Sequence, residues 1–103
     1  MSQDINEDFN DNMMNIYISA KKECNYNATY FLRMLSNHAG VGTVKILLTS
    51  DVPQYGFEKL WECDRLDLTV EALVRQQKYR TLFTEQEIQT AEKRLRDYGF
   101  VLD

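Results

Sequence analysis

The chain has 103 residues with a formal net charge of −4, and 44% of its residues are apolar and 27% charged. This length and composition are typical of one ordinary globular domain. Four of the acids stand in the first twelve residues, which contain no base, so the remaining acids and bases balance. A balanced body argues against a dominant phosphate-binding surface, which needs a basic excess, and against an acidic mimic of nucleic acid.

Residues 1–8 are polar and acidic, and this composition predicts a disordered tail. Apolar residues then recur at helical spacing: Phe9, Met13, Ile16, Tyr17 and Ala20. We expect a first helix over residues 9–23, capped by Asp8, with two lysines in its last turn, where the helix dipole favours positive charge.

A second helix is predicted from a cap at Asn27 to a stop at Gly40. One face of this helix is expected to carry Tyr30, Phe31, Met34 and Leu35. The two glycines of the segment HAGVG predict a tight corner, after which Thr43 would cap a short third helix containing Val44, Leu47 and Leu48. The alternative for residues 43–50 is a β-strand, because valine, threonine and isoleucine are common in strands.

Residues 51–56 surround the single proline and are expected to form a loop. The fourth helix is predicted over residues 57–63, with an apolar stripe that points into the core: Phe57, Leu60 and Trp61. Thr69 would cap a fifth helix over residues 70–77. Glu71 falls in the first turn of that helix, where the dipole favours a carboxylate, so we interpret it as part of the helix start.

The last helix has the clearest boundaries. Thr84 and Glu87 have the spacing of a capping box, which predicts a helix over residues 85–98. Gly99 stands where a helix end needs a left-handed residue, and Phe100 is placed to pack against that end. Together the patterns predict an all-α protein, with residues 9–103 forming a single compact domain of about five to six mostly short helices.

The two cysteines, Cys24 and Cys63, stand far apart in the sequence. The N-terminus lacks the basic segment and apolar run of a signal peptide, and the longest apolar run, residues 46–48, is far too short to cross a bilayer. We therefore expect a cytoplasmic protein with no membrane association. In that reducing compartment two free thiols are favoured over a disulfide.

From residue 30 onward the sequence resembles a small helical module found in bacterial proteins of unassigned function, either alone or appended to larger domains. The matching segments are YFLRML, AGVGTVKILL, GFEKLWE, RLDLTVEALV, YRTLFTEQE and AEKRLRDYGF. The resemblance covers roughly residues 30–100 and implies an all-helical fold. Some of the larger proteins that carry such segments are associated with DNA processing or phage defence. It implies no catalytic residues.

Residues 58–67 hold four carboxylates, of which Glu58 and Glu62 share one helical face. Paired carboxylates suit acid–base or metal chemistry, but this spacing matches no calcium loop and no histidine stands near. His38 is the single histidine, and the sequence identifies no nucleophile and no orienting group that would form a catalytic triad with it. We predict that the protein is not an enzyme and assign no catalytic, cofactor-binding or metal-binding residues.

Two basic clusters support an alternative function, weak nucleic-acid binding. They comprise Arg75, Lys78 and Arg80, and Lys93, Arg94 and Arg96. If both clusters met on one face, they could contact phosphates. The second cluster also has a simple structural explanation, because bases late in a helix complement its dipole.

The favoured hypothesis is a non-catalytic protein-interaction or accessory module that binds a protein partner or a second copy of itself. It is motivated by a complete pattern of caps and apolar stripes, by many aromatic residues, and by the lack of a coherent catalytic set. The aromatic residues expected at the partner surface are Tyr26, Tyr30 and Phe31, and Trp61 is a further candidate as the alternative to its place in the core.

Overall fold

The computed structural model describes residues 4–49 and 55–102, which form helices and turns with no strand. The helices are α1 (Ile5–Cys24), α2 (Thr29–Leu48), α3 (Tyr55–Glu62), α4 (Val70–Val74) and α5 (Glu85–Asp97), with two 3-10 turns, η1 (Leu66–Leu68) and η2 (Gln77–Leu82). The all-α prediction is confirmed. The β-strand alternative is wrong for residues 43–48, which lie in α2. Most of the predicted loop, residues 51–54, lies outside the described residues, and Gly56 belongs to α3.

Helix α1 begins at Ile5, four residues before the predicted start, and the Asp4 side chain caps it by accepting from the backbone N–H of Asn6 at 3.1 Å. The predicted tail is therefore wrong from Asp4 onward. Two acidic residues occupy the first turn, where the helix dipole stabilises negative charge. Asp8, predicted as the cap, lies inside the helix and accepts a hydrogen bond from the Tyr79 hydroxyl.

Helix α2 changes direction at Ala39, where φ is 61° and ψ is −177°. The predicted corner is therefore present, but one residue before the glycine expected to form it. Such a break frees backbone donors, and the side-chain oxygen of Asn10 in α1 accepts from the N–H of Gly40 at 2.7 Å. A β-carbon at Gly40 would lie 2.6 Å from that oxygen, so glycine is required for the close approach of the two helices. Thr43, the expected cap, is instead buried within the second half of α2.

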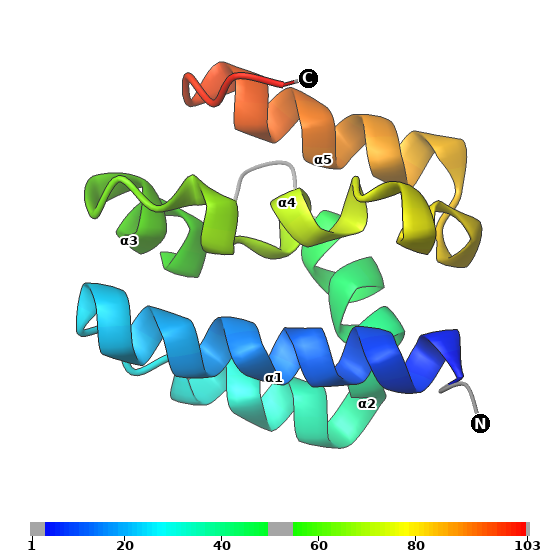
Figure 1. Cartoon of the computed structure of the whole chain (residues 1–103), viewed down its shortest axis with the longest axis horizontal. Coiled ribbons are helices and arrows are strands. Elements are labelled where there is room, and N and C mark those ends of the chain that lie inside the picture. Colours follow the sequence, from blue (N-terminus) through cyan, green and yellow to red (C-terminus); the bar gives the residue numbers. More distant parts are fainter. Residues whose placement is uncertain (1–3, 50–54, 103) are drawn as a thin grey trace.

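Figure 1 shows α1 and the first half of α2 side by side, while α5 lies on the opposite side of the molecule and the second half of α2 crosses toward it. The main hydrophobic core fills the space between these helices, and its fully buried members include Phe9, Met13, Val44, Val74 and Tyr79. A smaller hydrophobic group joins α3 to the end of α5 through Phe57, Leu66 and Leu95. The apolar interior is thus divided into two parts.

The predicted caps of the last two helices are confirmed. Thr69 accepts from the N–H of Ala72 at 3.2 Å, and the capping box between Thr84 and Glu87 has both of its hydrogen bonds. Helix α4, however, ends at Val74, and residues 77–82 form η2 instead of continuing it. At the end of α5, Gly99 has a φ of 86°, and the N–H of Phe100 donates to the carbonyl of Leu95 at 2.9 Å, as in a Schellman motif.

The expectation of two free thiols is wrong, because Cys24 and Cys63 form a disulfide. The C-terminal ends of α1 and α3 lie side by side, which brings the two α-carbons to 5.8 Å, a separation that a disulfide spans readily. The sequence argument used only the expected compartment and contained no information on which helix ends meet. The bond ties residues 39 positions apart.

Candidate functional site: an aromatic pocket beside the disulfide

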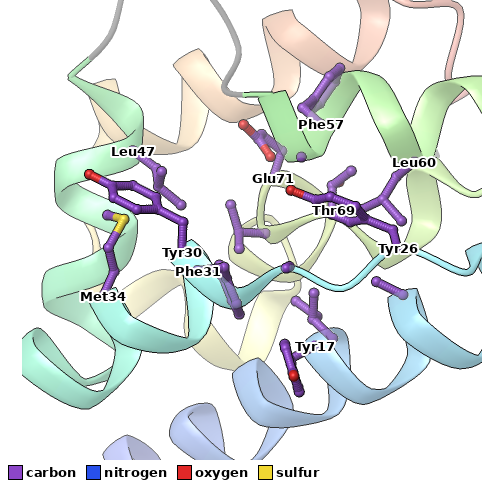
Figure 2. Close-up of a pocket in the computed structure, with 15 residues that line it drawn as sticks. Tyr17, Tyr26, Tyr30, Phe31, Met34, Leu47, Phe57, Leu60, Thr69 and Glu71 are labelled. Carbon is purple, nitrogen blue, oxygen red and sulfur yellow. The ribbon is translucent and has the colours of Figure 1, made fainter.

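A pocket of about 260 Å³ lies where the main core meets α3. Its lining comes from α1, the segment that joins α1 to α2, α2, α3 and the start of α4. In Figure 2 the side chains of Tyr26 and Tyr30 lie on opposite sides of this space. The other large apolar and aromatic side chains of the lining are Ile16, Tyr17, Phe31, Met34, Leu47, Phe57, Leu60 and Val70.

Most polar groups of the lining are occupied within the protein. The hydroxyl of Tyr17 donates to the side-chain oxygen of Asn27 at 2.9 Å. The hydroxyl of Thr69 donates to the carbonyl of Leu66 at 2.7 Å while accepting the cap hydrogen bond from α4. The pocket therefore presents mainly carbon to a ligand and suits an apolar group.

Among the described residues of the lining, Glu71 is the one carboxylate, and its side chain is only 4% exposed. Its Oε2 atom accepts a hydrogen bond from Nη1 of Arg94 at 3.0 Å, and the same nitrogen donates to the carbonyl of Leu47 at 3.1 Å. Burial raises the pKa of the Glu71 carboxyl, and the hydrogen bond from Arg94 acts against that rise. The pair links α4, α5 and α2 directly behind the pocket.

Glu71 lies in the first turn of α4, as the sequence predicts, and its side chain is also buried. The placement of Arg94 in a basic surface cluster is wrong, because Arg94 is buried against Glu71. A signal was present in the sequence, because Arg94 stands three residues after Ala91 and next to Leu95, within the inward stripe of α5. A charged residue at a stripe position needs a buried partner of opposite charge.

Three of the four aromatic residues predicted at the partner surface converge on this pocket: Tyr26, Tyr30 and Phe31. Tyr30 is 69% exposed, whereas the other two are partly buried. Trp61 lies elsewhere on the surface, 48% exposed, with its ring packed edge-on against Tyr98 at a centroid distance of 5.3 Å. The interpretation of Trp61 as a core residue is wrong. In α3 the positions of Phe57 and Leu60 face the interior, and Trp61 falls beside them.

The basic residues of the nucleic-acid alternative are mostly engaged with carboxylates. Arg75 and Arg80 both approach Oε2 of Glu92, at 3.6 and 3.9 Å. Lys78 pairs with Asp8 at 3.2 Å and Lys93 with Asp97 at 2.7 Å, while Arg94 is buried against Glu71. Arg96 is exposed near the end of α5. The six residues therefore do not form one open basic surface, and nucleic-acid binding stays a prediction.

The candidates for acid–base or metal chemistry lie apart from the pocket. Glu58, Glu62 and His38 are exposed on α3 and α2. Within residues 4–49 and 55–102, no group of three or more histidine, cysteine, aspartate or glutamate side chains is placed to hold a metal ion.

Comparison with known proteins supplies no relative: no family model, curated protein or solved structure matches the chain. The resemblance to a bacterial helical module stays a prediction. Among the described residues, none of the helices is long and apolar enough to span a membrane.

Proposed function

We propose that this protein is a non-catalytic interaction module that holds a large apolar side chain of a protein partner in its aromatic pocket. The observation that carries the proposal is the convergence of Tyr26, Tyr30 and Phe31 on a pocket whose remaining lining is almost entirely apolar. These aromatic residues come from a short stretch of chain around the start of α2, and Phe31 packs against the main core.

The size of the pocket favours a single side chain over a larger ligand. Pockets for drug-sized molecules usually span about 300–1,000 Å³, whereas a dry cavity of about 150 Å³ already accepts benzene. The volume of about 260 Å³ lies between these limits. It suits a tryptophan, phenylalanine or leucine side chain that a partner inserts as an anchor.

The rim of the pocket supports a protein partner in particular. Tyr30 presents most of its ring to the surface, and tyrosine is enriched at protein interfaces because it combines a large apolar area with a hydroxyl. An anchor in a pocket, surrounded by such a rim, is the arrangement that concentrates binding energy in a few residues.

The wider role follows the sequence expectation and is part of this proposal: an accessory module, alone or attached to a larger bacterial protein. A cytoplasmic location also belongs to the proposal. It requires that the disulfide form and break during the protein's working life, because persistent structural disulfides are rare in reducing compartments.

The test is selection of binding peptides from a displayed random library, followed by affinity measurements with purified peptides. We expect the selected peptides to share one large apolar anchor and to lose at least about tenfold in affinity when that anchor becomes alanine, as hot-spot residues do. The substitution Tyr30→Ala should weaken binding, whereas Ile18→Ala should not. Ile18 is a matched control, because it is similarly exposed, at 51%, and lies outside the pocket.

Light scattering at rising protein concentration shows whether the partner is a second copy of the chain. A concentration-dependent dimer that Tyr30→Ala abolishes would place self-association at the pocket. Peptides that bind equally well to the wild type and to Tyr30→Ala would refute the pocket as the partner site.

A further inference from the structure

The disulfide joins two walls of the aromatic pocket. Cys24 ends α1, four residues after the lining residue Ala20 and two before Tyr26. Cys63 directly follows α3, three residues after the lining residue Leu60. Figure 1 shows these helix ends together at one side of the molecule. The bond therefore fixes the spacing between the wall formed by α3 and the wall formed by α1 and the following segment.

The buried aromatic contacts of α3 hold the helix toward the end of α5. Phe57 is buried in the smaller hydrophobic group with Leu66 and Leu95, and its ring packs edge-on against Tyr98 of the α5 end at 4.9 Å. These contacts hold α3 against α5, away from α1.

Toward α1, Arg65 reaches Glu23 at 2.9 Å, beside the disulfide. Both side chains are more than one-third exposed, and exposed ion pairs of this kind contribute at most about 1 kcal/mol. Tyr26 of the following segment also lies against Gly56 of α3. The disulfide is the covalent tie between α3 and α1.

We propose that the Cys24–Cys63 disulfide is a redox switch for the pocket: the oxidised protein binds an apolar anchor, and reduction separates the walls and weakens binding. This inference rests on the proposed function, because it concerns the same pocket. The switching step is a two-electron thiol–disulfide exchange with a dithiol reductant. One thiolate of the reductant attacks a cysteine sulfur, the Cys24–Cys63 bond breaks, and the second thiolate closes the reductant's own disulfide. Cys24 and Cys63 each take up one proton and become free thiols.

The chemistry is accessible in the folded protein. Both cysteine residues are partly exposed, which favours attack by a reductant on the folded chain. After reduction, the main core still holds α1, α2, α4 and α5 together, and the smaller group still holds α3 against α5. We expect α3 to move relative to α1 while the rest of the fold stays intact. A pocket whose walls are correctly spaced in only a tenth of molecules binds its ligand about tenfold more weakly.

The experiment uses the full chain labelled with ¹⁵N and indole as the probe, because indole is the side-chain group of tryptophan. Indole is titrated into the oxidised protein and into protein reduced with dithiothreitol, and amide shifts report binding. The expected result is saturable binding to the oxidised form, with shifts at the pocket residues Ala20, Phe31 and Phe57, and at least tenfold weaker binding to the reduced form. The double variant Cys24→Ser/Cys63→Ser should bind as weakly as reduced protein, and dithiothreitol should not change it.

Hydrogen exchange of the same samples separates local from global effects. Reduction should speed exchange of amides in α3 while those of Ile88, Ala91 and Leu95 in α5 stay protected. Equal indole affinity in both redox states would overturn the switch and leave the pocket as a binding site. Loss of protection throughout α5 would also overturn it, since the disulfide would then hold the whole fold. If neither form binds indole, the proposed function fails and the switch fails with it.

Discussion

Glu71 and Arg94 form a buried ion pair. Replacing one partner should lower the free energy of unfolding far more than replacing both. Their side chains are 4% and 7% exposed, so replacing one partner leaves the other charge buried without this counter-ion. Glu71→Gln keeps the shape of the side chain but removes the carboxylate that faces the guanidinium, and we expect it to lower the free energy of unfolding by about 3–5 kcal/mol. Arg94→Met should cost a similar amount near pH 7, because it strands the carboxylate and leaves the carbonyl of Leu47 without this donor.

The two single variants should differ in their response to pH. Arginine stays charged at all accessible pH values, whereas a stranded carboxylate can be neutralised. Burial already raises the pKa of Glu71, and loss of Arg94 removes the hydrogen bond that acts against this rise. In Arg94→Met the folded protein then binds a proton that the unfolded chain releases. Between the raised folded pKa and the unfolded value of about 4.3, stability should therefore recover by about 1.4 kcal/mol for each unit that the pH falls. Glu71→Gln should show no such recovery.

Urea unfolding of the wild type, both single variants and the double variant Glu71→Gln/Arg94→Met measures these quantities. The double variant should be more stable than the sum of the single effects predicts, with a coupling energy of about 2 kcal/mol or more. Additive losses below about 1 kcal/mol each are what a solvated surface pair would give, and they would refute the reasoning. Equal pH dependence in the two single variants would refute the assignment of the stranded charges.

Three further perturbations test the ties between helices. The double variant Cys24→Ser/Cys63→Ser should lower the free energy of unfolding in urea by about 4 kcal/mol, because the bond closes a loop between residues 39 positions apart in the unfolded chain. Gly40→Ala should cost about 1–3 kcal/mol in the same assay, because the added β-carbon would lie 2.6 Å from a side-chain oxygen of α1, and no loss would disprove that close approach. The hydrogen bonds from Tyr79 and the neighbouring lysine lower the pKa of the Asp8 carboxyl, so the stability it provides is present above about pH 4 and lost as the pH falls through the lowered value. Asp8→Asn should therefore lower the melting temperature at pH 7 more than at pH 3, and an equal loss at both would contradict this.

Much of the fold could be predicted from the sequence, because its strongest signals are local. The capping box at Thr84 and Glu87, the cap at Thr69 and the left-handed Gly99 each involve residues within a few positions, and each is confirmed. Helix interiors follow from apolar spacing for the same reason. Errors at helix ends also have local causes: α1 starts early because Asp4 is as good a cap as the predicted Asp8, and it stands closer to the N-terminus.

The parts that could not be predicted depend on residues far apart in the sequence. The direction change in α2 falls at Ala39, where an alanine adopts a positive φ. A residue type that disfavours this region holds it only when the surroundings compensate, and here Asn10 of α1 satisfies the next backbone N–H. The burial of Arg94 depends likewise on Glu71, twenty-three positions earlier. Tyr26, Tyr30 and Phe31 could be singled out as a cluster from the sequence, but the pocket that they line appears only when α3 is placed against α1.

The disulfide and the expected cytoplasmic location are compatible if the redox state of the cysteine pair controls the pocket. The compartment determines which redox state a cysteine pair holds on average. The fold determines whether the two cysteines lie close enough to form a bond. In a reducing compartment the pair would be mostly open, and an oxidant would close the pocket walls around an anchor for as long as the bond lasts. In an oxidising compartment the same bond would persist, and the pocket would be a permanent site. Under the proposed function, the compartment therefore decides whether the pocket is a redox-dependent or a constant interaction surface, and its largely apolar lining is the same in both.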